Sequence, residues 1–184
     1  MDMMQAVFLG LLQGLTEFLP VSSSGHLAIA QYFITGFEQP GLLFDIILHF
    51  GTLVAVILYF NNDIKNLLRA PWSSAPQAGE YRKLLLLIIF GSIPTAIIGL
   101  TFKDTFAAMF HNIQLVGLML LITGALLFVA QHWRNGKRSL EKLTFTDAFL
   151  TGLVQAFAII PGISRSGSTI AVLLFRGVDA ASAA

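Results

Sequence analysis

The sequence has no cysteine and few charged side chains. Only 11% of its 184 residues are charged, whereas a soluble globular domain carries about 25%. The absence of cysteine excludes disulfides and thiolate metal sites, and the low charge excludes an ordinary soluble globule. The net charge of +1 comes from basic residues clustered between apolar runs. This is typical of loops beside a bilayer and not of a nucleic-acid-binding face, so we expect no nucleic-acid partner.

Lysine and arginine are also missing before the first apolar stretch, which contains Glu17. A secretory signal would begin with positive charge and would not carry an acid within its apolar part. We therefore interpret this stretch as part of the mature protein.

The sequence does contain long apolar runs. A hydrocarbon core of about 30 Å needs about 20 apolar residues, and three runs meet that length, at about 42–60, 84–102 and 113–131. Two shorter apolar segments each lead into a Ser/Gly-rich stretch, which predicts re-entrant helix-loop-helix hairpins at about 6–34 and 147–176. The expected fold is an all-α polytopic membrane protein.

The two predicted hairpins resemble each other at a constant spacing. Five identical pairs are each 142 positions apart: Gly10 and Gly152, Gln13 and Gln155, Ser22 and Ser164, Ser24 and Ser166, Gly25 and Gly167. Three spanning helices between the copies would insert the second copy upside down, which predicts an inverted-topology repeat. We place the first repeat at 1–142 and the start of the second at 143–184, and we expect the rest of the second repeat to be missing.

Loop charges indicate an orientation. The connections at 61–83 and 134–146 each carry four Lys or Arg residues, so the positive-inside rule places both in the cytoplasm. The connection between them has only Lys103 as a firm positive charge and is expected outside. The two hairpins would then open on opposite sides, and their loops could meet near the midplane.

The two hairpin loops, at 20–26 and 161–169, are rich in hydroxyls, glycines and free backbone amides. Irregular backbone at membrane depth is tolerated where it lines a wet cavity, and such loops at helix N-termini suit a phosphate. The hydroxyls of these loops, Ser22 and Ser24 among them, are therefore candidates to bind it.

Two charged residues stand out in these segments. Arg165 has no acid near it in the sequence, and its planar guanidinium matches phosphate oxygens in bidentate fashion; the alternative is an arginine that snorkels to the interface. Glu17 shares a helix face with Gln13, four residues earlier. It could hold Mg²⁺ or Ca²⁺ against a diphosphate or orient His26, or it could be an ordinary interfacial glutamate at a helix end.

Three further residues are candidates for acid–base or supporting roles. His26 follows the serine run and could act as a general base toward a serine or as a general acid, with a purely structural histidine as the alternative. Asp45 and His49, four apart in the first spanning run, could contact the site residues without binding the substrate. A buried structural pair is an equal alternative.

The run QGLTEFLPVSSSGH at 13–26 and the run PGISRSGST at 161–169 resemble the two motifs of the undecaprenyl-diphosphate phosphatase (bacitracin-resistance) family. The resemblance extends over the whole chain. It implies a multi-pass enzyme of the bacterial inner membrane that hydrolyses undecaprenyl diphosphate to the monophosphate and recycles this carrier lipid for the cell wall, with a divalent cation as cofactor. Carried over by position, the resemblance implies Glu17, Ser23, His26 and Arg165 as catalytic residues. It also implies that Gln13, Ser164, Ser166 and Thr169 lie around the diphosphate.

Two questions stay open at the level of sequence. Ser23 could attack the terminal phosphorus, or a metal-activated water could attack it directly. The alternative function is a transporter or channel, because inverted repeats whose loops meet at the midplane also move ions and lipids. Association into a homo-oligomer is also left open.

Overall fold

Three apolar helices form the membrane-facing frame. The structure is a computed structural model that describes residues 2–34 and 42–184. Helices α5 (Ala78–Thr101) and α7 (Ile113–Ala130) are each long and apolar enough to cross a membrane. Helix α3 (Leu42–Tyr59) qualifies together with α4 (Asn61–Arg69), from which it is bent by 77°. The predicted all-α polytopic membrane protein is confirmed, with the run at 42–60 forming part of this bent pair.

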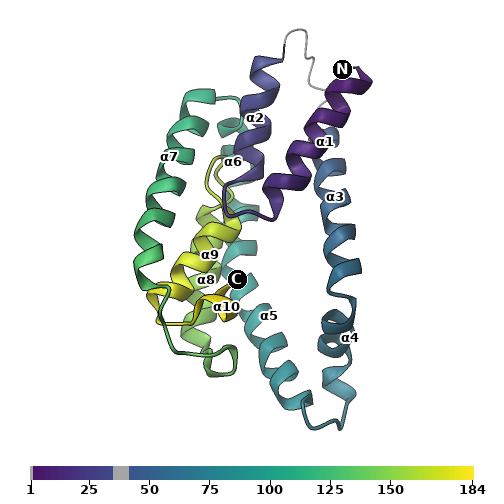
Figure 1. The fold of residues 1–184 in the computed structure, drawn as a ribbon, viewed down its shortest axis with the longest axis vertical. Helices are drawn as coiled ribbons and strands as arrows, with labels where there is room; N and C mark the ends of the chain where they lie inside the picture. Colours follow the sequence, from purple (N-terminus) through teal and green to yellow (C-terminus); the bar gives the residue numbers. More distant parts are fainter. Residues whose placement is uncertain (1, 35–41) are drawn as a thin grey trace.

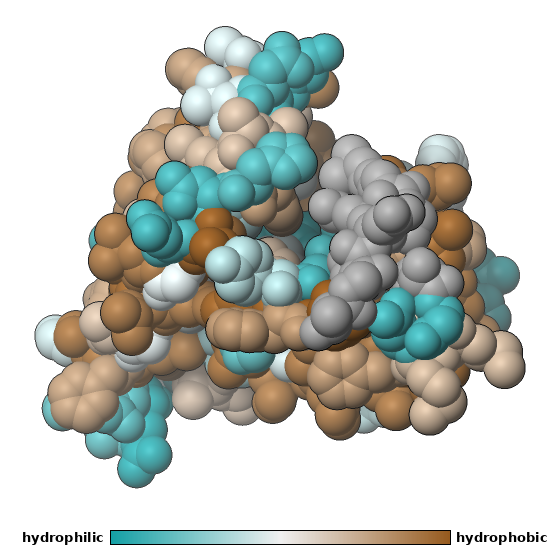
Figure 2. Space-filling model, turned by 90° about the horizontal axis from the view of Figure 1, so that it is seen from above, coloured by the Kyte–Doolittle hydropathy of each residue, from teal (hydrophilic) through white to brown (hydrophobic). Residues whose placement is uncertain are grey.

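The outer faces of these helices are apolar. Only 6% of the most apolar stretch of α5 and 17% of that of α7 are buried inside the protein. Hydrophobic residues accordingly dominate the surface seen in Figure 2. Exposed apolar area on this scale is unfavourable in water and suits contact with lipid.

The predicted connection at 61–83 is more ordered than we expected from its polar sequence. It contains α4 and a 3₁₀ turn at Ala70–Trp72. Neither glycine nor proline occurs between Tyr59 and Ala70, so the chain stays helical beyond the bend until Pro71 ends the α-helical run. The next connection contains the short helix α6 (Lys103–Met109), and 3₁₀ turns at Gln131–Trp133 and Leu140–Lys142 follow α7.

Two helical hairpins occupy the positions that the sequence indicates. Helices α1 (Met3–Glu17) and α2 (Ser23–Phe33) form the first, and α8 (Phe145–Phe157) and α9 (Arg165–Phe175) form the second. Each hairpin turns at a proline, Pro20 or Pro161. In Figure 1, α9 lies inside the molecule between α7 and α5, and the loops of the two hairpins lie side by side. The inverted insertion and the boundary at 142 remain predictions.

Helix α9 is anchored at its far end by a buried carboxylate. Asp147, in the first turn of α8, is 1% exposed. It accepts hydrogen bonds from Arg138 at 2.6 Å, from Arg176 at 2.8 Å and from the Thr144 hydroxyl at 2.7 Å. Burial alone would raise the pKa of Asp147, but these hydrogen bonds outweigh it and hold the pKa well below its usual range. The cluster joins the loop after α7, the start of α8 and the end of α9.

Helices α5 and α8 approach each other closely at two glycines. A Cβ at Gly152 would lie 1.7 Å from the backbone oxygen of Gly91, and a Cβ at Gly91 would lie 2.8 Å from the oxygen of Ala148. The hydroxyl of Thr95 donates to the Gly152 carbonyl at 2.7 Å across the same contact. Small residues thus let the two backbones meet, as in many membrane helix pairs.

Candidate active site

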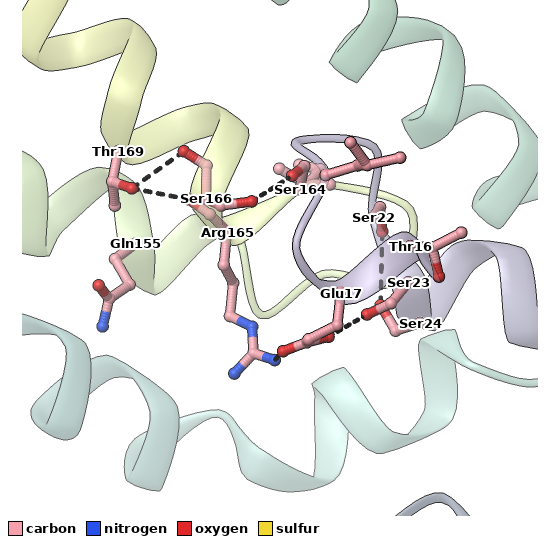
Figure 3. A pocket seen from close by; sticks show the side chains of 12 residues that line it. Thr16, Glu17, Ser22, Ser23, Ser24, Gln155, Ser164, Arg165, Ser166 and Thr169 are labelled. Atoms are coloured by element: carbon pink, nitrogen blue, oxygen red, sulfur yellow. Dashed lines mark hydrogen bonds and ion pairs between the residues drawn. The ribbon is translucent and has the colours of Figure 1, made fainter. Parts of the chain in front are cut away.

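A polar pocket of about 320 Å³ lies where the two hairpin loops meet. Its lining comes from the end of α1, the starts of α2 and α9, the loops before these two helices, and one residue of α8 (Figure 3). The predicted site residues that line it are Glu17, Ser22, Ser23, Ser24, Ser164, Arg165, Ser166 and Thr169. The structure therefore brings together eight residues from two segments that are far apart in the sequence, and their roles remain predictions.

Two helices begin at this pocket with the same cap. Ser22 precedes α2 and accepts a hydrogen bond from the Gly25 amide at 3.4 Å, and Ser164 precedes α9 and accepts from the Gly167 amide at 3.0 Å. The positive ends of two helix dipoles and their free amides are thus directed at one place. Such an arrangement favours an anion.

Glu17 is the centre of the polar contacts in the pocket. Its Oε2 accepts hydrogen bonds from Gln13 Nε2 at 3.1 Å and from the Ser23 hydroxyl, which makes a short contact. The donated proton of Ser23 therefore already points at a carboxylate. This geometry suits the removal of a proton from Ser23.

Arg165 reaches across from the second loop to this carboxylate. Its Nη2 lies 3.5 Å from Glu17 Oε1, and 56% of the Arg165 side chain is exposed to the pocket and its surroundings. The guanidinium therefore keeps most of its donors available beside the acid (Figure 3). Because a single contact of this length joins the two groups, the guanidinium can bind a phosphate group in place of the carboxylate.

Two predicted site residues do not line the pocket. Gln13 is 1% exposed and lies behind Glu17, to which it donates; its Oε1 is buried and has no hydrogen-bond partner among the described residues. His26 donates from Nδ1 to the backbone oxygen of Ser22 at 2.9 Å, since a carbonyl can only accept. We therefore place Gln13 as a residue that orients Glu17, and the acid–base role of His26 stays a prediction.

The two supporting candidates on α3 separate into different contacts. His49 donates from Nδ1 to the Asp45 backbone oxygen at 2.8 Å, which turns its Nε2 toward Glu17 Oε2 at 3.8 Å. The Asp45 carboxylate accepts from Gln31 of α2 at 2.8 Å. His49 therefore lies beside the carboxylate of the pocket, whereas Asp45 ties α3 to α2.

Thr123 of α7 holds the second loop by two hydrogen bonds. It was not among the predicted site residues. Its hydroxyl is buried, donates to the Gly162 carbonyl at 2.8 Å and accepts from the Ser164 amide at 3.1 Å. Gly162 has a φ of +96° and approaches the backbone of α7 closely. One hydroxyl thus fixes the turn that presents Ser164 and Arg165.

Glycines also let the two loops touch. A Cβ at Gly25 would lie 2.9 Å from the Cα of Gly162, and a Cβ at Gly167 would lie 2.9 Å from the Pro20 carbonyl. Neither position leaves room for a larger side chain without movement of the backbone. Glycine at these two positions is therefore needed for the contact between the loops.

Gln155 of α8 also lines the pocket and was not among the predicted site residues. The repeat gave the only signal, since Gln155 matches Gln13. The residue that corresponds to Glu17 in the second copy is Ile159, so the two halves of the pocket are chemically unequal.

The pocket fits a divalent cation only in part. Within residues 2–34 and 42–184, no group of three or more His, Asp or Glu side chains could hold a metal, and the only acid among the pocket-lining residues is Glu17. Mg²⁺ is commonly bound by one or two carboxylates together with substrate phosphates. The donor set therefore fits a cation that shares its ligands with a bound diphosphate and not one held by protein alone.

The fold and this pocket define a polytopic membrane protein whose polar pocket lies at two helix N-termini and is lined by a carboxylate, serines and an arginine. Residues 6–184 match the family model described as bacitracin resistance protein BacA. The chain belongs to this family.

Curated relatives agree with the family model. The chain is 56% identical over 184 residues to an undecaprenyl-diphosphatase of Syntrophotalea carbinolica, 46% over 179 residues to one of Carboxydothermus hydrogenoformans, and 42% over 184 residues to one of Halothermothrix orenii. These matches cover 97% to 100% of this chain and 70%, 65% and 68% of the respective relatives. The chain thus spans about two thirds of the length of these proteins.

Proposed function

We propose that this chain carries the hydrolytic centre of an undecaprenyl-diphosphate phosphatase. The substrate is undecaprenyl diphosphate, and the products are undecaprenyl phosphate and inorganic phosphate. The enzyme recycles the carrier lipid for cell-wall synthesis in the bacterial inner membrane, which it crosses several times, and its activity accounts for a role in bacitracin resistance. The observation that carries the proposal is the contact between the Ser23 hydroxyl and Glu17 opposite Arg165, at two helix N-termini.

The chemistry follows from these contacts. The terminal phosphate lies between the amides at the starts of α2 and α9, and Arg165 neutralises its developing charge. Ser23 Oγ attacks the terminal phosphorus while Glu17 accepts the serine proton, and the bond from phosphorus to the bridging oxygen breaks. Undecaprenyl phosphate leaves, and water then cleaves the phosphoserine to release phosphate and restore Ser23. A water that attacks directly, with Glu17 as its base, is the alternative route.

Further groups support this centre. Gln13 and His49 both approach Glu17 at Oε2, at 3.1 Å and 3.8 Å. Ser164, Ser166 and Thr169 supply hydroxyls to the diphosphate from the start of α9. A divalent cation bound by Glu17 and the diphosphate oxygens would supply further neutralisation of phosphate charge.

Phosphate release in detergent tests the proposal. Detergent leaves no second compartment, so a transporter would release nothing, whereas the phosphatase would turn over. We expect release by the wild type and by Arg134→Ala, which removes an exposed arginine outside the pocket. We expect a loss of at least about 10²-fold in Arg165→Ala, the order seen when a donor to developing negative charge is removed. No release by folded wild-type protein would refute the proposal.

A trapping experiment separates the two routes. Rapid acid quenching during turnover of labelled substrate should capture phosphate on Ser23 and not on Ser22 or Ser24. Full activity in Ser23→Ala, with no labelled protein in the wild type, would instead favour direct attack by water.

A further inference from the structure

A second, apolar cavity adjoins the polar pocket. It has a volume of about 200 Å³ and lies between α5 and α8. Gln155 lines both cavities, so both reach this side chain. In Figure 3, Gln155 lies on the side of Thr169 and Arg165, away from the serines of the first loop.

The lining of this groove is suited to a hydrocarbon. Its walls are mainly aliphatic side chains and the two glycines of the α5–α8 contact, and they include Leu84, Leu87, Ile88 and Leu173. The backbones of Gly91 and Gly152 approach each other closely in this lining, so no bulky side chain fills the groove there. Apolar surface of this kind, next to a membrane-spanning helix, takes up an apolar ligand without dehydration of charged groups.

The polar groups along the groove are mostly satisfied from within the protein. Ser92 donates to the Ile88 carbonyl at 2.8 Å, and Asp147 at the far end is paired with two arginines. Thr151 Oγ1 is the exception, since it is buried without a hydrogen-bond partner among the described residues. The groove therefore offers no unpaired charge and little hydrogen bonding to a polar occupant.

We infer that this groove binds the part of the prenyl chain nearest to the diphosphate, with Gln155 at the junction between head and tail. The inference rests on the proposed function and adds to it the path of the lipid. Its basis is that Gln155 borders both cavities, since we expect a diphosphate held at Arg165 and Thr169 to place its first isoprene units beside this side chain. The small volume admits only a short part of a polyprenyl chain, so the remainder continues into the lipid along α5.

Photo-crosslinking locates the chain directly. The probe is a prenyl diphosphate with a diazirine on the isoprene unit next to the diphosphate, added to the purified protein in detergent. We expect labelled peptides from α5 around residues 84–92 and from α8 around residues 147–155. Labelling confined to α1, α3 or the outer face of α7 would overturn the inference.

Adjacent isoleucines provide a matched pair of variants. Ile88 lines the groove and Ile89 does not, and their exposures are 47% and 54%. Ile88→Trp should raise KM for undecaprenyl diphosphate by about tenfold or more with a smaller change in kcat, because the larger side chain would fill the groove and even one methylene too many in an apolar pocket has an effect of this order. Ile89→Trp should leave both constants unchanged.

Equal effects of the two substitutions, in proteins of equal thermal stability, would refute the groove. Failure of the wild type to release phosphate would refute the proposed function instead, and the crosslinked peptides would still show whether the groove holds the prenyl chain. The two claims therefore fail separately.

Discussion

The guanidinium of Arg165 lies 3.5 Å from the carboxylate of Glu17, although 148 positions separate them in the chain. Glu17 ends α1 and Arg165 begins α9, so this contact joins the two hairpins inside the pocket. Its distance is at the limit of a hydrogen bond, and the pair is partly exposed. A phosphate group could therefore replace the carboxylate as the partner of the guanidinium.

The first prediction concerns this pair. Arg165→Lys keeps the charge but loses the planar fork, so kcat/KM should fall by about 10²-fold. A double-mutant cycle with Glu17→Gln should show a coupling energy on the order of 1 kcal/mol or more, because both residues act on one phosphate. Strict additivity of the two losses would show that Arg165 and Glu17 act independently.

A second prediction concerns Thr123. Thr123→Val preserves the shape but leaves the Gly162 carbonyl and the Ser164 amide without their partner, which should cost about 1–3 kcal/mol of stability. Thr123→Ser keeps the hydroxyl and should retain most of the activity. The measurements are thermal unfolding in detergent and phosphate release. If the valine variant matched the wild type in both, the hydroxyl would not hold the loop.

A third prediction compares two helical glycines. Gly152→Ala brings a Cβ against the backbone of Gly91, so it should destabilise the protein by about 1–3 kcal/mol and separate α5 from α8. Gly117→Ala in α7 meets nothing within 4 Å. It should be neutral or stabilise by up to about 1 kcal/mol, because alanine favours helix. Thermal unfolding of both variants decides; equal stability would contradict the close contact.

The fourth prediction concerns acid stability. Because pairing lowers the pKa of Asp147 in the folded protein, its carboxylate stabilises the fold above about pH 4, the usual value for aspartate, and this contribution is lost as the pH falls further toward the lowered pKa. Asp147→Asn should therefore be less stable than the wild type at neutral pH, by about 1–3 kcal/mol once the partial exposure of both arginines is allowed for.

The control for this experiment is Asp63→Asn, which changes an exposed aspartate of α4. Thermal unfolding should show a gap between Asp147→Asn and the wild type that narrows below pH 4, and no such gap for Asp63→Asn. A gap that stayed constant down to pH 2 would show that charge is not the reason for the loss.

Much of this architecture could be predicted from apolar length and motif spacing. The spans at 84–102 and 113–131 follow from the length of a bilayer, and the clustering of Ser22–Ser24 with Ser164–Ser166 follows from two similar loops. The sequence could not indicate the acid that pairs with Arg165, because no acid lies near it in the chain. It also could not indicate the helix at 61–69, since polar residues between two apolar spans are typical of a loop.

Two site residues escaped prediction for different reasons. Thr123 lies in an apolar span, where a threonine commonly bonds to its own helix backbone, so only tertiary structure shows that it holds a loop. Gln155 matches Gln13 in the repeat, which was a signal for it. The position that matches Glu17 is Ile159, which has no carboxylate, so α8 did not look like part of a polar site.

The most direct test of the account is single-turnover phosphate release from undecaprenyl diphosphate by the wild type and by Glu17→Gln, each shown to be folded by thermal unfolding. The glutamine preserves the size of the side chain and a hydrogen bond to Ser23 but cannot accept its proton. The account predicts rapid release by the wild type and a loss of about 10²-fold or more in Glu17→Gln, the order of a general-base contribution. Equal rates in the two proteins would contradict it.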